Sequence, residues 1–229
     1  MKSLLILSLL FIGCVFKNNS IELESINNEI WLLDSFIDSL EIGNKGNNKI
    51  ELSCYRFADK PDSVTLQFYA KNYDKWILKN NLALEYNGVR GFGSKLEDLN
   101  NDGYLDFHYN SMEAARGAND IRKIFMYSPE FDSLYIIKNS ENYPNLRYNK
   151  ELDCIDAFLV TGSCSTVFLK LDNDSLKEIA WVHAADYIVV TEINADGKSI
   201  TLLDTINTFG DFERFINYKP LKTYSELQD

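Results

Sequence analysis

Apolar and polar side chains alternate with a period of two along most of the chain. The alternation is clear at Ile50–Tyr55 and resumes at Val64–Tyr69, after a turn at Lys60–Asp62. This period is typical of antiparallel strands with one buried face. Similar short segments follow at residues 75–78, 123–127, 133–137, 154–160, 165–171, 176–182, 187–193, 199–203 and 212–218. The pattern predicts an all-β, antiparallel fold whose strands are joined by short turns.

Two choices of architecture stay open. A propeller-like arrangement and a β-sandwich both fit the strands, although no strong repeat of fixed period supports a full, regular propeller. The segment Ile30–Ile42 is also ambiguous. Its apolar residues follow a helical spacing that Gly43 would stop, but the segment equally fits an extended pair kinked at Asp34–Ser35.

The most specific motif is the stretch Asp-Leu-Asn-Asn-Asp-Gly-Tyr-Leu-Asp at residues 98–106. It matches the first nine positions of a D-x-[DN]-x-[DN]-G calcium loop, with a glycine at the sharp turn. Position 12 is Tyr109 instead of a bidentate glutamate, so a water or a distant carboxylate such as Glu113 must complete the shell. The predicted calcium ligands are the side chains of Asp98, Asn100, Asp102 and Asp106 and the carbonyl of Tyr104.

The same residues also permit a turn without metal. Asn-Asp and Asp-Gly pairs form turns through their own hydrogen bonds, and a hairpin needs no cation. A weaker echo begins at Glu192 and includes Asn194 and Asp196, but its ninth position is Ile200, which cannot bind a cation. Residues 194–198 are therefore predicted to form a plain hairpin turn.

The N-terminus has the features of a bacterial lipoprotein signal. A short basic start is followed by an apolar run at residues 3–12, which is too short to span a bilayer as a helix. Leu10–Cys14 resembles a lipobox, with Phe11 in place of the usual leucine. This resemblance implies cleavage before Cys14 and lipidation of its thiol, the alternative being an ordinary cleaved signal.

We therefore divide the chain into a signal peptide (1–13), a lipidated cysteine with a tether or N-terminal segment (14–45) and a single antiparallel β domain (46–229). Cleavage removes one lysine and no acid, which leaves 22 basic and 34 acidic residues and a net charge of −12. Such a charge argues against nucleic acid and against charge-driven docking on anionic lipid. It suits a cationic protein partner or bound cations, with membrane contact through the lipid anchor only.

The motif at residues 98–106 resembles the DxNxDGxxD core of FG-GAP and VCBS repeats. The wider order, with an aromatic strand at Ile124–Tyr127 and later hairpins, resembles a group of secreted bacterial β proteins. That group includes periplasmic immunity lipoproteins that inhibit lysozyme-like toxins. The resemblance covers roughly residues 60–182, and it implies a propeller-like fold, a calcium loop and binding to a cell-wall hydrolase. The Ser-Gly-x-x-Tyr segment of the periplasmic lysozyme inhibitors is absent.

Cysteine and histidine usage does not predict catalysis. In a hairpin around Gly162, Cys164 should lie opposite residue 160, which is too far from Cys154 for a disulfide. A bridge from Cys54 or three buried free thiols both stay open. His108 is expected to be a half-exposed strand residue or a neighbour of the calcium loop, and no zinc or nucleophile–base spacing occurs.

The sequence therefore predicts a membrane-tethered, non-catalytic binding protein of the bacterial envelope, periplasmic or surface-facing, with one calcium loop. An inhibitor of a lysozyme-like hydrolase is the first hypothesis. A structural or adhesive envelope module is the alternative.

Overall fold

The computed structural model describes residues 30–227, and the predicted all-β fold is confirmed. The first sheet contains β1 (Ile30–Asp38), β2 (Asn48–Phe57), β3 (Ser63–Asn72) and β4 (Lys75–Glu85). The middle sheet contains β5 (Lys95–Glu97), β6 (Asp106–Ala114), β7 (Asn119–Ser128) and β8 (Ser133–Ile136). The last sheet contains β9 (Arg147–Asn149), β10 (Cys154–Val160), β11 (Cys164–Asp172), β12 (Ser175–Ala184), β13 (Tyr187–Ile193) and β14 (Ser199–Ile206).

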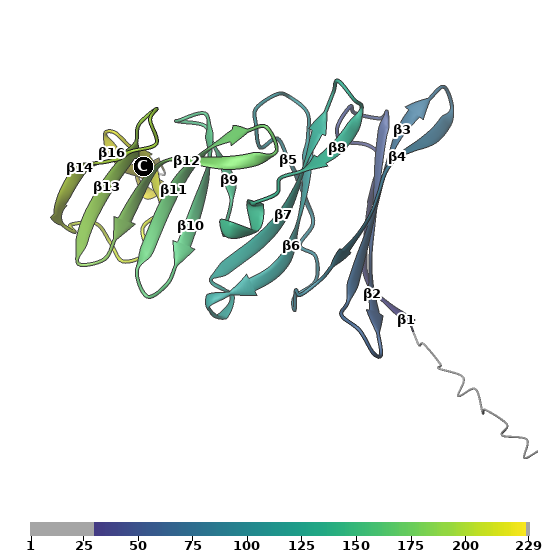
Figure 1. The fold of residues 1–229 in the computed structure, drawn as a ribbon, viewed down its shortest axis with the longest axis horizontal. Helices are drawn as coiled ribbons and strands as arrows, with labels where there is room; N and C mark the ends of the chain where they lie inside the picture. Colours follow the sequence, from purple (N-terminus) through teal and green to yellow (C-terminus); the bar gives the residue numbers. More distant parts are fainter. Residues whose placement is uncertain (1–29, 228–229) are drawn as a thin grey trace, which may run out of the picture.

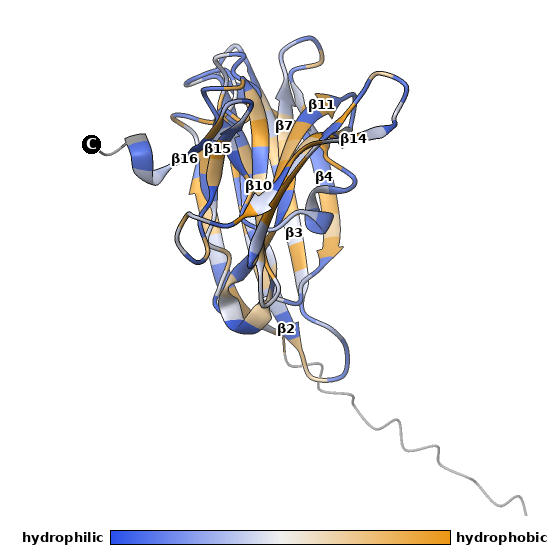
Figure 2. Ribbon diagram, turned by 90° about the vertical axis from the view of Figure 1, so that its left-hand side faces the viewer, coloured by the Kyte–Doolittle hydropathy of each residue, from blue (hydrophilic) through white to orange (hydrophobic). Residues whose placement is uncertain are grey.

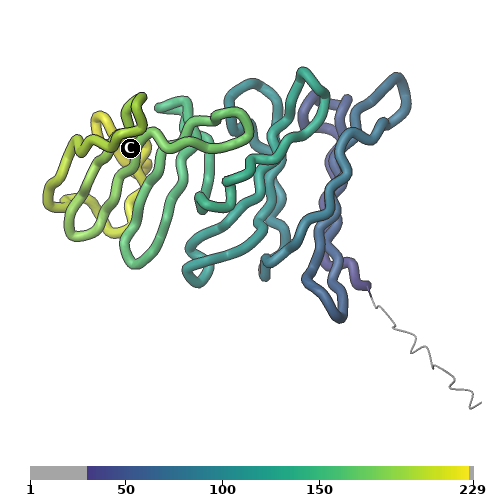
Figure 3. Tube along the Cα trace, viewed as in Figure 1, coloured from purple at the N-terminus to yellow at the C-terminus, as the bar shows by residue number. Residues whose placement is uncertain are grey.

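A C-terminal hairpin of β15 (Phe215–Tyr218) and β16 (Leu221–Thr223) follows the last sheet. Short 3-10 turns lie at η1 (Ala115–Gly117), η2 (Ser140–Asn142) and η3 (Ser225–Leu227). Every sheet is an antiparallel meander of strands that are consecutive in sequence. The three sheets follow one another along the long axis of the molecule, and the chain passes along this axis once (Figures 1 and 3). This layered stacking agrees with the sandwich alternative.

The layers are held together by separate hydrophobic clusters. One joins the first and middle sheets, a second joins the middle and last sheets, and a third lies between the last sheet and β15. Hydrophobic positions lie along the strands, whereas most connecting loops are hydrophilic (Figure 2). Alternation in β2 and β3 follows from this arrangement, because only one face of the first sheet meets another layer.

The middle sheet is buried on both faces. Residues 106–111 at the start of β6 are all buried. Phe107 and Tyr109 belong to the cluster with the first sheet. Asp106 and His108 must point to the opposite face, toward the last sheet, because successive side chains of a strand alternate. The prediction that His108 is half-exposed is wrong, since its side chain is 2% exposed.

The ambiguous segment at residues 30–42 is extended over Ile30–Asp38, which form β1, and bends at residues 39–41. β1 pairs with β2 from Ile30↔Phe57 to Asp38↔Ile50, with a register shift between Leu32 and Asp34, next to the predicted kink. β1 therefore lies inside the segment 14–45 that was assigned to the tether. Residues 14–29 of that segment lie outside the described residues.

Asparagine side chains join neighbouring layers. Asn80 of β4 donates to the carbonyl of Leu134 in β8 at 3.0 Å and accepts from its amide at 2.8 Å. Asn119 of β7 forms the same pair of bonds with Val160 of β10, at 3.0 Å each. An amide side chain has a donor and an acceptor side by side, so it can pair with one peptide group as a neighbouring strand would.

Candidate functional site

The predicted calcium loop connects β5 to β6, at one end of the middle sheet. A cavity of about 240 Å³ separates it from the last sheet and is lined by Leu99 and Asn100 of the loop and by Tyr148 and Lys170 of the last sheet. The loop is also tied to the first sheet, because the Gly43 amide donates to the Leu105 carbonyl at 2.9 Å. The motif therefore lies where all three layers approach one another.

The loop side chains form a local network of hydrogen bonds. The two carboxylate oxygens of Asp98 accept from the amides of Asp102 at 3.1 Å and Gly103 at 2.9 Å. Asp102 accepts from the Tyr104 amide and from the Asn100 side chain, both at 2.9 Å. Gly103 has a φ of +87°, a conformation that favours glycine at the turn. Each carboxylate oxygen has a second lone pair, so these bonds leave positions for a cation.

Asp106, the last predicted ligand, is fully buried. Its carboxylate accepts from the amides of Leu99 at 3.0 Å and Tyr127 at 2.9 Å, which ties the start of the loop to β7. The pKa of Asp106 is raised to about 7, because burial and, to a smaller extent, the charges of Asp102 and Asp98 outweigh the two donating amides, which lower it. The charges of Asp98 and Asp102 thus disfavour the ionised form of Asp106.

The predicted calcium ligands are three carboxylates, one amide side chain and one backbone carbonyl. Within residues 30–227, no three His, Cys, Asp or Glu side chains converge on a common point. Two of the predicted loop ligands, the Asn100 side chain and the Tyr104 carbonyl, are neither carboxylates nor His or Cys side chains. The suggestion that Glu113 completes the shell is wrong, because Glu113 lies seven residues along β6 from Asp106 and hydrogen-bonds to Asn110 and to the Val89 amide. The other predicted ligands remain a prediction.

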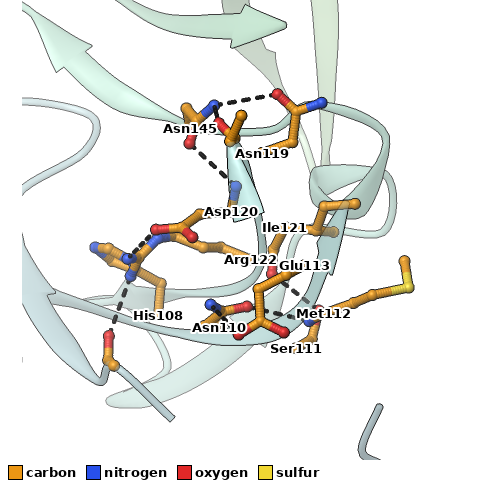
Figure 4. Close-up of polar contacts among 12 residues, drawn as sticks. His108, Asn110, Ser111, Met112, Glu113, Asn119, Asp120, Ile121, Arg122 and Asn145 are labelled. Carbon is orange, nitrogen blue, oxygen red and sulfur yellow. Dashed lines mark hydrogen bonds and ion pairs between the residues drawn. The ribbon is translucent and has the colours of Figure 1, made fainter. Parts of the chain in front are cut away.

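A buried polar network occupies the opposite face of β6 from Phe107 (Figure 4). Arg122 of β7 donates to His108 Nδ1 at 3.0 Å and to the Gly93 carbonyl at 3.1 Å. His108 Nε2 lies 3.4 Å from Glu97. Burial and the Arg122 charge lower the pKa of His108, and Glu97 raises it by a smaller amount. These contacts join β5, β6 and β7, and a structural role accounts for them.

His183 forms a second polar pair. It lies directly opposite Ser165 on β11 and β12, and its Nδ1 is 2.9 Å from the Ser165 hydroxyl. Among residues 30–227, no carboxylate forms a hydrogen bond or ion pair with His183. A cross-strand contact between half-buried residues accounts for this pair.

The hairpin at residues 194–198 forms as predicted. The Asn194 amide donates to the Lys198 carbonyl at 3.0 Å, and the Asn194 side chain accepts from the amides of Asp196 and Lys198. This turn has no counterpart to the buried Asp106.

The three cysteines of the described residues are free and buried. Cys164 lies directly opposite Val160, as the hairpin predicted. Burial raises the pKa of Cys54 to about 11 and that of Cys154 to about 12.

These thiols are expected to resist alkylation in the folded protein. The thiolate is the reactive form, and burial suppresses both its population and its access. Mass spectrometry after iodoacetamide treatment at pH 8 should find Cys54, Cys154 and Cys164 unmodified without denaturant and modified in guanidinium. Rapid labelling of any of them in the folded state would contradict this assignment.

Cys14 and the lipobox lie outside the described residues. Within residues 30–227, no helix is long and apolar enough to cross a membrane. The lipid anchor therefore remains a prediction from the sequence.

Comparisons with known proteins find similarity among solved structures alone. No protein-family model matches the chain, and no curated protein matches it. Among solved structures, one described as "Structure of a Xanthomonas Type IV Secretion System related protein" has 13% sequence identity and a TM-score of 0.47. The similarity covers 78% of this chain and 95% of that chain. It is too distant to assign a family or a function.

Proposed function

We propose that this chain is a lipid-anchored, non-catalytic binding protein of the bacterial envelope whose partner is a cationic, lysozyme-like cell-wall hydrolase. The observation that carries the proposal is the acidic excess of the chain, 34 acidic against 23 basic residues. Complementary charge accelerates association and favours a basic partner over neutral ones. The signal-like N-terminus supports the proposal, because it predicts export to the compartment where such hydrolases act.

The end of the last sheet offers a place for a cationic side chain. A cavity of about 400 Å³ lies between the β10–β11 and β12–β13 turns and the segment after β14, and Asp186 and Asp211 line it. Among the described residues, neither carboxylate has an ion pair or a hydrogen bond. The rim also includes Asn207 and the exposed ring of Phe212. A lysine or arginine side chain could bury its stem against the ring while its charge meets the carboxylates.

We expect the purified chain to bind a basic lysozyme-type hydrolase and to slow its hydrolysis of peptidoglycan, with an affinity that falls as salt rises. Asp186→Asn combined with Asp211→Asn should weaken binding about tenfold or more, because both free charges of the cavity are removed. Titration calorimetry and a turbidity assay of cell walls measure the two effects.

Asp74→Asn is the matched control. Asp74 is also exposed and lacks an ion pair, but it lies in the β3–β4 turn of the first sheet. It should leave binding nearly unchanged. Binding without inhibition would favour the structural or adhesive envelope module. No binding to basic hydrolases at low salt, or peptidoglycan hydrolysis by the chain itself, would refute the proposal.

A further inference from the structure

The start of β1 exposes four consecutive apolar side chains. Ile30, Trp31, Leu32 and Leu33 are 55%, 45%, 58% and 42% exposed. Val89, which is 84% exposed, lines the same small cavity as Leu33. These five residues, called the apolar end below, lie at the edge of the first sheet where the described chain begins (Figure 1).

The side chains of the apolar end lie on both faces of the first sheet, so a partner on one face would leave part of them exposed. β1 is an edge strand, and Trp31 and Leu32 pair with successive residues of β2, Arg56 and Tyr55. Successive side chains of a strand point to opposite faces of the sheet. A flat protein surface would cover only one of them, whereas the interfacial region of a bilayer can surround the whole end of a strand. Tryptophan is also enriched at that interface.

Among the described residues, the basic side chains near the apolar end are those of Arg56, Lys60 and Arg90, the last of which follows Val89 and is exposed. Arg56 is paired with Asp62 at 2.9 Å, and the Lys60 ammonium lies 4.1 Å from the centre of the Phe57 ring. Because Asp62 and the Phe57 ring engage two of these three cations, contact with a membrane would be driven mainly by apolar burial and should occur on neutral lipid. This fits the overall negative charge of the chain.

The length of chain before Ile30 keeps this end near a membrane. Residues 15–29 separate it from the predicted lipidation site, Cys14. Fifteen residues span at most about 50 Å when fully extended. A lipid anchor combined with a second, apolar contact holds a protein on a bilayer more firmly than either alone.

We propose that the apolar end inserts into the interfacial region of the bilayer that holds the anchor, and thereby sets the orientation of the three layers on the membrane. This inference rests on the proposed lipid anchor and extends the expected contact beyond the anchor itself. The last sheet lies at the other end of the long axis from β1, so it would be the layer farthest along that axis from the apolar end (Figure 1).

Quenching of tryptophan fluorescence by brominated lipid tests the contact. The full-length, acylated protein is placed in neutral phosphatidylcholine vesicles with brominated chains. The chain has three tryptophans, at positions 31, 76 and 181. We expect clear quenching in the wild type and at least about a twofold smaller quenched fraction in Trp31→Phe. Ile30→Ser with Leu32→Ser should reduce quenching in the same direction, and both substitutions lie at exposed positions that should fold normally.

Trp76→Phe is the matched control, because Trp76 is 36% exposed but pairs with Lys71 at the opposite end of the first sheet. It should keep the full quenching. Equal quenching in wild type and Trp31→Phe, or none in the wild type, would overturn the inference. The latter is also the result expected if a second copy or the residues before Ile30 cover the apolar end. Acyl labelling of the same sample, with Cys14→Ala as the negative control, shows whether the anchor is present. Labelled protein without quenching would overturn the apolar contact alone, whereas unlabelled protein would overturn both the anchor and the contact.

Discussion

Arg214→Met is expected to lower the free energy of unfolding by about 3–5 kcal/mol, the usual cost of removing one partner of a buried ion pair. The Arg214 guanidinium forms an ion pair with Asp156 and donates to the carbonyls of Asn145 at 2.8 Å and Asp156 at 3.0 Å. Asp156 is fully buried in β10. Removal of the guanidinium would leave a carboxylate in the interior with only neutral donors and a more distant charge, Arg147 at 3.8 Å.

Chemical denaturation of the two proteins measures this loss. Lys222→Met is the control, because it breaks an exposed ion pair with Glu151 in the same C-terminal segment and should change stability little. Adding Asp156→Asn to Arg214→Met should recover part of the loss, since the unpaired charge is then removed. Equal effects of Arg214→Met and Lys222→Met would mean that the buried pair does not anchor the C-terminal hairpin.

The strands with one solvent face could be predicted from sequence. β2 and β3 alternate because only one face of the first sheet meets another layer. The same logic fails for β6, since a strand in the middle layer has no solvent face. A polar residue such as His108 would face solvent in a strand with one exposed face. Here it lies in the interior, where its Nδ1 accepts a hydrogen bond from Arg122. The alternation pattern alone cannot distinguish a strand covered on one face from a strand covered on both, because it does not show whether another sheet packs on the polar face.

Local spacing also predicted the turns better than the long-range pairs. The 194–198 hairpin and the internal bonds of the 98–104 loop involve residues a few positions apart, whose geometry is fixed by short-range rules. The Asp156–Arg214 pair joins residues 58 positions apart. No spacing rule relates such residues, and only the packing of the C-terminal hairpin on the last sheet brings them together. Likewise, the exclusion of Glu113 from the loop follows only from the direction of β6.

Calcium is expected to stabilise the folded protein through the loop at residues 98–106. The charges of Asp98 and Asp102 disfavour the ionised form of Asp106, and a cation would offset this effect while using the free lone pairs of the loop oxygens. An incomplete shell suggests a dissociation constant of about 10⁻⁴–10⁻³ M, the range of extracellular modules. At 10 mM calcium, which is about 10 to 100 times that constant, mass action predicts a gain of about 1.4–2.7 kcal/mol.

The gain should depend on pH in a defined direction. Burial raises the pKa of Asp106 from its ordinary 3.8 to about 7. Without metal, the folded protein holds the Asp106 proton more tightly than the unfolded chain does. The resulting stabilisation is fully present below pH 3.8 and is lost as the pH rises through about 7. Calcium must displace this proton, so its effect should be larger at pH 8 than at pH 6.

Thermal melts with calcium and with chelator at both pH values decide the matter. Asp102→Ala should abolish the calcium effect. Asp106→Asn should in addition cost about 1–3 kcal/mol without calcium, because an amide NH₂ group cannot accept a hydrogen bond and either the Leu99 or the Tyr127 amide would lose its partner. Asp196→Ala, in the hairpin that lacks a buried aspartate, should leave the calcium effect intact. If the wild-type melts with calcium and with chelator coincide at pH 8, the loop is held by its hydrogen bonds alone, and the motif serves to fasten β6 to β7 through Asp106.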